Sequence, residues 1–405
     1  MLFLGLASAF TEHQMKNAHV FAEAVKENEA LGIGIENRFY GRSLNQDMLK
    51  ADMLQYLNFE QSFQDTLAIQ RQVSQDLELG STPWIVFGAS YSAVKAVIHR
   101  MKFPDNFYAA VGSSAMLGIK FDMPEYYGSM EQHLKNTEIY GSQACYESVN
   151  TAFGEIDFLL EKGEFNKTAE DFNLCKILTT EMDKHGAGKA IGGRLANVLY
   201  NHHVIPAASQ FALICGPAYT AASPYEALRR IVQLLDAFNN QQGCVDASYA
   251  TAEAHNRLWQ DGIADWDEYD ADPGNRAWGY EGCTELGFAH VCNRTLGCPL
   301  SKYGAKEVAI SLCRDSFNVS EEQMRAASGK FIEKYGGTAL DQTVTRLILT
   351  HGETDPGKSF EPHVNDESRD LTSLTIPMPA KIVFNESRSD FDLHENRLIA
   401  SSASI

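Results

Sequence analysis

Residues 84–98 read WIVFGASYSAVKAVI, and this stretch decides the fold class. The apolar run Trp84–Phe87 predicts a buried strand, while apolar residues from Val94 onward recur at helical spacing. Ser90 lies between them, and the positions two before and two after it hold small residues. A strand, a tight turn, a serine and a helix together form a nucleophile elbow. We therefore predict an α/β sheet fold with Ser90 as a nucleophile; the alternative is a turn that contains a serine by chance.

A serine nucleophile of this kind takes its acid and its histidine from later in the chain, in that order. The apolar run Leu347–Thr350 predicts a late strand, and Asp355 follows in the next loop, where the acid belongs. The alternative for Asp355 is an Asx-Pro turn. The loop after the next predicted strand, Lys381–Phe384, should carry the histidine, but residues 385–393 read NESRSDFDL. The candidate site therefore lacks a histidine at the expected place.

The backbone N–H of Tyr91 supplies half of the expected oxyanion hole. Tyr91 directly follows the candidate nucleophile and opens the predicted helix. Unpaired N–H groups at a helix N-terminus carry positive potential, which favours a developing negative charge.

Sheet and helix signals occupy different parts of the chain. Further buried strands are predicted at Leu31–Ile35 and Tyr108–Val111. The long stretch 135–330 is predicted to be helical, with a strong helix start at Ser223 and a buried apolar stripe from Leu228 to Phe238. Sheet material therefore lies at both ends of the chain, with helices between.

This order predicts an inserted helical domain. We assign residues 1–134 and 331–405 to an α/β core and residues 135–330 to a helical cap over the sheet's active edge. A second capping box is predicted at Ser320 with Gln323.

Eight cysteines lie between Cys145 and Cys313 and indicate an oxidising compartment. Their clustering predicts disulfides, with the pairing left open; the alternative is eight reduced thiols in a cytosolic protein. Four N-glycosylation sequons, at Asn166, Asn293, Asn318 and Asn385, favour the secretory interpretation.

The beginning of the chain fits a secreted protein poorly. Met1–Ala9 reads MLFLGLASA, which has no basic residues and is short for a signal peptide. It could equally be a first strand, and we expect that the natural N-terminus is missing. No run approaches the ~20 apolar residues of a membrane span, so none is predicted.

Charge and histidine placement argue against several ligands. The net charge of −19, from 53 acidic and 34 basic residues, argues against nucleic acid as a partner. His202 and His203 are adjacent, and neighbours on a helix point about 100° apart. Because no carboxylate lies at ligand spacing, we expect no metal, and nothing in the sequence calls for a cofactor.

Four motifs, in order and spacing, resemble the prolyl carboxypeptidase and dipeptidyl peptidase II family, which includes thymus-specific serine peptidase and fungal prolyl peptidases. Residues 36–43 (ENRFYGRS) resemble its EHRFYGxS, and residues 88–93 (GASYSA) resemble its GGSY(G/S)G elbow. Residues 278–285 (WGYEGCTE) resemble WxYQxCTE, and residues 351–357 (HGETDPG) resemble NGxxDPW. The resemblance implies an α/β-hydrolase core with an inserted helical, disulfide-bonded cap.

The departures from this pattern lie mainly at the positions of the catalytic residues. Alignment on Asp392 and Leu393 places Ser389 where the family has its catalytic histidine. A serine hydroxyl is too weak a base to activate Ser90, and loss of the base costs about 10⁶-fold in turnover in an unrelated triad. His394, five residues after Ser389, is a candidate substitute base.

Other positions also depart from the family pattern. His351 and His363 flank the acid loop and are further candidates for a substitute base. The acid loop has Gly357 where the family has tryptophan, and the family's early Gly-Gly-Glu has only Gly5-Leu6-Ala7 as its counterpart.

These features predict a secreted or lysosomal/vacuolar glycoprotein with a peptidase fold and little or no peptidase activity. Peptides or a partner protein are expected to bind between core and cap; the sequence does not define an oligomeric state. The second hypothesis is an active serine exopeptidase, cleaving short peptides near proline or small residues as the family does, with a substitute histidine. A third is a structural or surface protein without a cleft.

Overall fold

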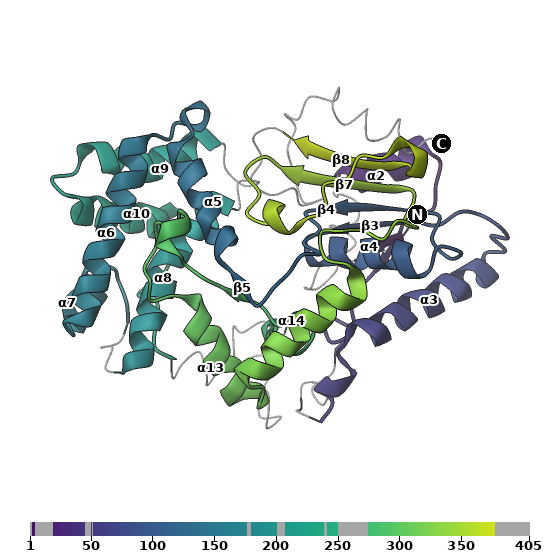
Figure 1. Ribbon diagram of the computed structural model, residues 1–405, viewed down its shortest axis with the longest axis horizontal. Helices are drawn as coiled ribbons and strands as arrows, with labels where there is room; N and C mark the ends of the chain where they lie inside the picture. The colour runs from purple at the N-terminus through teal and green to yellow at the C-terminus, as the bar shows by residue number, and fades with distance from the viewer. Residues whose placement is uncertain are drawn as a thin grey trace.

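The structure is a computed structural model that describes residues 2–4, 19–44, 50, 52–175, 180–200, 207–238, 241–249 and 274–376. Its centre is a six-stranded sheet in the order β2-β1-β3-β4-β7-β8, with every neighbouring pair parallel (Figure 1). The strands are β1 (Leu2–Leu4), β2 (Ile33–Ile35), β3 (Ile85–Ala89), β4 (Ala109–Ser113), β7 (Leu347–Gly352) and β8 (Leu371–Ile376). A separate pair is formed by β5 (Asp122–Met123) and β6 (Ala289–His290).

Four predicted strands are confirmed, each with bounds shifted by one or two residues: they correspond to β2, β3, β4 and β7. The predicted strand Lys381–Phe384 lies outside the described residues. Strand β8 was not predicted, because its sequence LTSLTI mixes apolar and polar residues without a regular pattern and the strand lies at the edge of the sheet. Such a half-buried strand lacks the continuous apolar run that marks the central strands.

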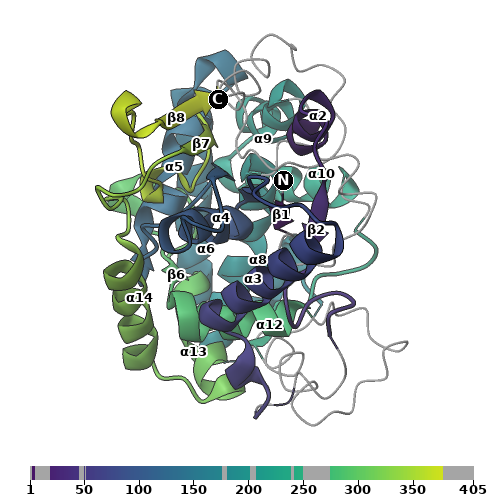
Figure 2. The same ribbon diagram turned by 90° about the vertical axis from the view of Figure 1, so that its right-hand side faces the viewer.

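Helices cover both faces of the sheet, as the two views show (Figures 1 and 2). Successive side chains of a strand point to opposite faces. Val86 shares a buried cluster with Val94 and Val97 of helix α4 (Tyr91–Lys102), while the ring of Phe87 lies 5.4 Å from that of Phe21 in α2 (His19–Glu27). Helices α3 (Phe59–Asp76) and α14 (Glu321–Tyr335) extend the cluster of Val86.

A second group of helices packs around its own hydrophobic core, away from the sheet (Figure 1). It contains α5 (Pro124–Lys135), α6 (Gln143–Glu161), α7 (Phe165–Asp171), α8 (Glu181–Tyr200), α9 (Ala207–Thr220) and α10 (Pro224–Phe238). Helices α12 (Gly274–Glu281) and α13 (Ala305–Phe317) follow in the chain before α14. The chain thus passes from the sheet into the helices and returns to it at β7.

Two helix starts predicted from local sequence patterns are confirmed. The Ser223 hydroxyl accepts the N–H of Glu226 at the start of α10, and Ser320 forms a complete capping box with Gln323 at the start of α14. The apolar stripe of α10 is buried through Leu235, but Phe238 is 44% exposed, so its predicted burial is wrong. Phe238 is the last residue of the helix and lies beyond the core that buries the rest of the stripe.

All eight cysteines form disulfides, which confirms the predicted cross-linking and settles the pairing. The pairs are Cys145–Cys215, Cys175–Cys244, Cys283–Cys313 and Cys292–Cys298. Disulfides of this density are typical of oxidising compartments.

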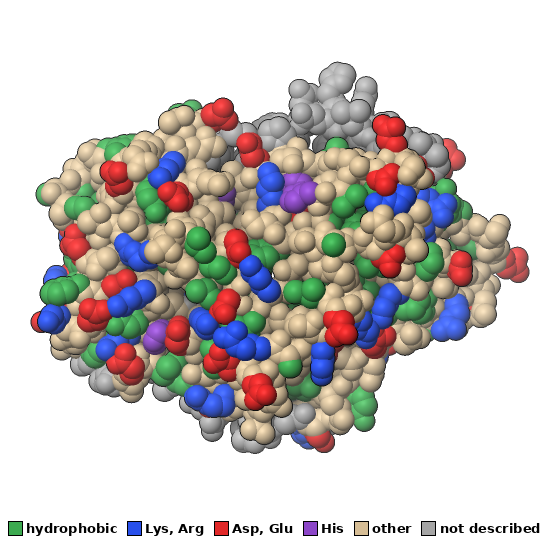
Figure 3. Space-filling model, in the orientation of Figure 1, with side chains coloured by type: hydrophobic (Ala, Val, Ile, Leu, Met, Phe, Trp, Pro, Cys, Tyr) green, Lys and Arg blue, Asp and Glu red, His purple; other side chains and the backbone are tan. Residues whose placement is uncertain are grey.

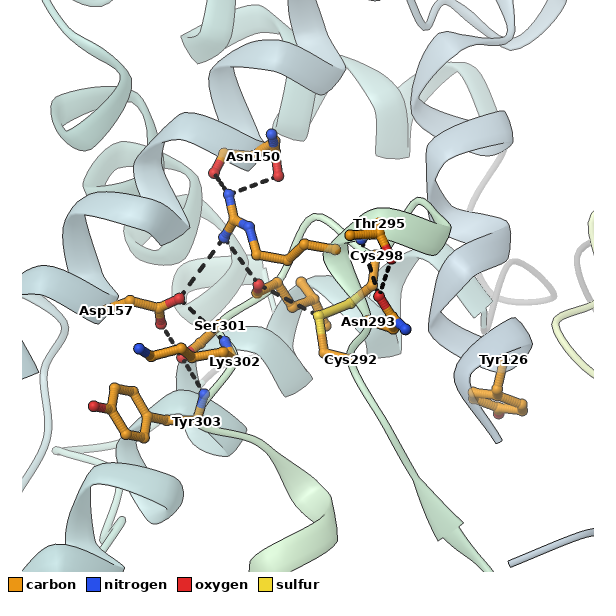
Figure 4. Close-up of a disulfide and its surroundings, with 12 residues drawn as sticks. Tyr126, Asn150, Asp157, Cys292, Asn293, Thr295, Cys298, Ser301, Lys302 and Tyr303 are labelled. Carbon is orange, nitrogen blue, oxygen red and sulfur yellow. Dashed lines mark hydrogen bonds and ion pairs between the residues drawn. A yellow bond between two sulfur atoms is a disulfide. The ribbon is translucent and has the colours of Figure 1, made fainter. Parts of the chain in front are cut away.

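The Cys292–Cys298 disulfide closes a short loop that is tied to helix α6 (Figure 4). Arg294, inside the loop, donates a hydrogen bond to Asn150 Oδ1 at 2.7 Å and lies 3.8 Å from Asp157 Oδ2. The covalent link and these contacts hold the loop against the helical group.

The surface carries no marked segregation of charge on the face that Figure 3 shows, where acidic and basic side chains are interspersed. In the part of the chain that the structure describes, none of the helices is both long enough and apolar enough to cross a membrane.

Candidate active site

Ser90 occupies a strained turn between strand β3 and helix α4. Its backbone has φ 56° and ψ −123°, a conformation that a residue with a side chain rarely adopts. The turn is held by a hydrogen bond from the Ser90 N–H to the carbonyl of Ser113, at the end of the neighbouring strand β4. This is the geometry of a nucleophile elbow, predicted from the sequence around Ser90.

The elbow leaves no room for a side chain at Gly88. A Cβ atom there would overlap the backbone carbonyl of Ser92 and lie 2.7 Å from the backbone nitrogen of Ala93. Because both contacts are to backbone, neither can move away without opening the turn. Glycine at this position is therefore a steric requirement of the elbow.

Replacement of Gly88 by alanine is expected to destabilise the protein by about 3 kcal/mol, because the new methyl group can be accommodated only by moving the elbow. Urea unfolding of the variant beside the unchanged protein measures the loss. The matched control is Gly329→Ala: Gly329 is exposed within α14 and has no atom within 4 Å of the added carbon. The control should be neutral or slightly stabilising, by up to about 1 kcal/mol. Equal stability of the Gly88 variant and the control would contradict the proposed packing.

Asp355 is buried in the loop that follows β7, at the same edge of the sheet as Ser90. One carboxylate oxygen accepts the Ser114 hydroxyl, and the other accepts the Gly357 N–H at 2.7 Å. Ser114 directly follows β4 and has φ 59°. The carboxyl ends of three adjacent parallel strands thus bring together Ser90, Ser114 and Asp355, and Ser114 was not identified from the sequence.

The acid loop is shaped by the absence of a side chain at Gly357. A Cβ atom at this position would lie 2.7 Å from Met116 Sδ and 3.1 Å from Asp355 Oδ1. Met116 therefore fills the space into which a tryptophan at position 357, as in the resembling family, would have to extend. Gly357 and Met116 together give this side of the site a different shape from one with tryptophan at position 357.

The histidines beside the acid loop are engaged with other groups. His351 and Glu361 are both 1% exposed, with His351 Nδ1 3.4 Å from a Glu361 oxygen, and His351 Nε2 lies 2.7 Å from Thr375 Oγ1 on strand β8. His363 Nε2 donates to the backbone carbonyl of Lys358 at 2.9 Å. Burial lowers the pKa of both imidazoles, and the Lys358 ammonium lowers them further.

The positions that decide whether a base exists are not among the described residues. Ser389 and His394 both lie beyond residue 376, so the missing histidine and its candidate substitute remain predictions. His202 and His203 likewise fall outside the described residues. The same holds for the sequon at Asn385.

A buried polar network includes two residues from the first turns of the elbow helix, Tyr91 and Lys95. Glu281 accepts hydrogen bonds from the hydroxyls of Tyr40, at 2.7 Å, and Tyr91. The ammonium of Lys95 donates to Asn37 Oδ1 at 2.9 Å and lies 4.5 Å from the centre of the Tyr91 ring. Burial lowers the pKa of Lys95 to about 8, although the charge of Glu281 acts to raise it. Lys95 is therefore still mainly protonated at neutral pH.

Fold and site together define a class of protein. A parallel sheet with helices on both faces, a strained serine after a central strand and an acid after a later strand are the marks of an α/β-hydrolase-type fold. The chain belongs to the serine carboxypeptidase S28 family, which matches residues 1–392. The resemblance drawn from four sequence motifs is thereby confirmed.

Individual relatives cover most of this chain at modest identity. It is similar to the thymus-specific serine protease of Mus musculus (29% identical, 86% of this chain and 68% of the relative). It is also similar to the lysosomal Pro-X carboxypeptidase of Mus musculus (24% identical, 87% and 69%) and to a probable extracellular serine carboxypeptidase of Arthroderma benhamiae (20% identical, 88% and 53%). The chain therefore spans about two thirds of the mouse relatives and about half of the fungal one.

Proposed function

We propose that this protein keeps the scaffold of a serine peptidase but has little or no peptidase activity, because Ser389 stands where the catalytic base belongs. The observation that carries this proposal is the engagement of the two histidines beside the acid loop. His351 contacts Thr375 and Glu361, and His363 bonds to a backbone carbonyl. Because both imidazoles are engaged with other groups, these contacts support a site in which neither histidine replaces the missing base.

The proposal also includes a binding site for a peptide or partner protein. We place a helical cap, residues 135–330, over the carboxyl edge of the sheet, so that peptides or a partner protein bind between cap and core. Ser90 and Asp355 lie at that edge and would be the groups nearest to such a ligand. Peptide ligands follow from membership in a peptidase family.

A route through the secretory pathway, ending outside the cell or in a lysosome or vacuole, fits the covalent structure. Four disulfides favour an oxidising compartment, and the relatives include proteins named lysosomal and extracellular. Of the sequon asparagines in the described part, Asn166 and Asn318 are exposed and could accept glycans, while Asn293 is half-buried.

Fluorophosphonate labelling tests the proposal directly, because the probe reacts with an activated serine. Ser389→His is expected to label at least about 100-fold faster than the unchanged protein, since a positioned general base contributes about 10²–10⁴-fold. Ser90→Ala in the Ser389→His background is the control, and it should abolish labelling. Equal rates for the unchanged protein and Ser389→His would mean that another group already serves as base and would overturn the proposal.

The strained backbone of Ser90 favours a second candidate, an active serine exopeptidase. Strain of this kind costs roughly 1–3 kcal/mol and tends to persist at functional sites. In this alternative His394 takes the proton of Ser90 and Asp355 orients its imidazole. The labelling experiment separates the two, because the active enzyme would label without substitution and would lose labelling in a His394→Ala variant.

A further inference from the structure

Glu281 is a buried carboxylate that joins three distant segments beneath the nucleophile elbow. It is 0% exposed and ends helix α12. The Tyr91 hydroxyl, 190 residues away in the chain, and the Tyr40 hydroxyl, 241 residues away, both donate to it. Tyr91 is the residue directly after Ser90, so this carboxylate forms a hydrogen bond with the side chain of the first residue of the elbow helix.

The buried ammonium of Lys95 is close enough to this carboxylate for the two charges to interact. A buried carboxylate without a cation or hydrogen-bond donors is strongly unfavourable. The Lys95 ammonium, one helical turn after Tyr91, lies over the face of the Tyr91 ring and is itself held by Asn37 and by Ser62 Oγ at 3.0 Å. The Tyr91 side chain is therefore held at its hydroxyl by Glu281 and at its ring face by Lys95.

Holding the Tyr91 side chain restricts the peptide unit that joins Ser90 to Tyr91. Two rings also pack against that of Tyr91 edge-to-face, Trp278 with centroids 5.2 Å apart and Phe59 with centroids 5.6 Å apart. A strained residue such as Ser90 keeps its conformation only where its surroundings over-determine it. Among these contacts, the hydrogen bond to Glu281 is the one with a fixed direction.

We propose that Glu281 is a positioning residue for the oxyanion hole, acting through the Tyr91 side chain to fix the direction of the Tyr91 N–H. The inference rests on the proposed role of that N–H beside Ser90. Glu281 does not touch the reacting atoms. The corresponding motif position in the resembling family is glutamine, whose single carbonyl oxygen can accept one of the two tyrosine hydroxyls while its NH₂ group meets the other oxygen.

The test measures labelling rate separately from probe affinity, with Ser389→His as the parent. Glu281→Leu should lower the maximal rate of fluorophosphonate labelling about 30-fold without changing the half-saturating probe concentration, because loss of an oxyanion donor costs about 10²–10³-fold and misalignment costs less. Glu281→Gln should stay within about three-fold, since its amide still meets both hydroxyls. An unchanged maximal rate in Glu281→Leu would overturn the inference.

A matched variant separates positioning from general destabilisation. Glu285 is a neighbouring, half-buried carboxylate that accepts the Phe59 N–H at 3.0 Å rather than a Tyr91 atom. Glu285→Leu should lower the stability to urea and leave the maximal labelling rate unchanged. An equal loss of rate in Glu285→Leu and Glu281→Leu would show that the effect is structural only. Should Glu281→Leu not fold, Tyr91→Phe removes the same hydrogen bond with a smaller change, and it should lower the rate in the same direction.

A spectroscopic measurement keeps the inference testable if the parent does not label, an outcome that bears on the proposed function alone. In protein labelled with ¹⁵N-tyrosine, the Tyr91 amide signal is assigned by its loss in Tyr91→Phe. Glu281→Leu should shift or broaden that signal clearly more than Glu281→Gln or Glu285→Leu does. A Tyr91 signal that does not respond to Glu281→Leu would contradict the inference whatever the labelling result.

Discussion

Between pH 7 and pH 4.5 the unchanged protein should lose about 3 kcal/mol more of its free energy of unfolding than a His99→Phe variant does. His99 is 0% exposed on the buried face of α4, and its ring lies 4.8 Å from that of Phe63 and 5.1 Å from that of Phe107. Its Nδ1–H donates to the Lys95 carbonyl at 2.7 Å. Among the described residues, its Nε2 has no hydrogen-bond partner. A protonated ring would therefore be a poorly solvated cation among aromatic rings.

The sign of the effect follows from where the proton binds. Burial is the main cause that lowers the pKa of His99 to about 3, whereas an unfolded histidine has a pKa of about 6.5. Between these values the unfolded chain binds a proton that the folded protein does not, so stability falls as the pH drops from 6.5 toward 3. At pH 4.5 the difference spans about two pKa units, or about 3 kcal/mol.

Urea unfolding of both proteins at pH 7 and at pH 4.5 measures this contribution. Carboxylates titrate in both proteins alike, so the difference between the two pH dependences isolates His99. The phenylalanine ring fits the same aromatic surroundings, and its stability should decline less on acidification. Parallel decline of the two proteins would mean that His99 is protonated in the folded state.

The elbow could be predicted from sequence because its determinants are local. An apolar strand, small residues at the turn and a helical stripe all fall within residues 84–98, and the structure gives Ser90 the strained backbone that this pattern requires. The place of Asp355 followed similarly from an apolar strand and the loop after it. Helix caps at Ser223 and Ser320 are local signals of the same kind.

What could not be predicted depends on contacts between distant segments. The hydrogen bond of Ser114 to Asp355 spans 241 residues, and that of Tyr91 to Glu281 spans 190. Neither partner carries a local pattern that marks the contact, and disulfide pairing is undetermined for the same reason. His351 illustrates the limit well: its place beside the acid made it a candidate base, but its register on β7 sets it opposite Thr375 of β8. Its Nε2 meets the side chain of that residue.

Loss of the Cys145–Cys215 disulfide should destabilise the protein by about 4 kcal/mol, and loss of Cys292–Cys298 by about 2 kcal/mol. The two pairs close loops with sequence separations of 70 and 6. In the chain-entropy description, a cross-link restricts the unfolded chain more as its loop lengthens. The first pair also joins α6 to α9 within the core of the helical group, where both cysteines are buried, so its effect should fall on that group.

Replacing both cysteines of each pair by alanine and unfolding the variants in urea without reductant gives the comparison. Each variant loses two sulfur atoms, so Cys292/Cys298→Ala is the control for the chemistry of the change, and the remaining difference reports loop length and packing. Helical signal should disappear at a lower urea concentration in Cys145/Cys215→Ala than in the control variant. If the short-loop variant proves the less stable, the contacts of Arg294 with Asn150 and Asp157, rather than chain entropy, dominate what the Cys292–Cys298 link contributes.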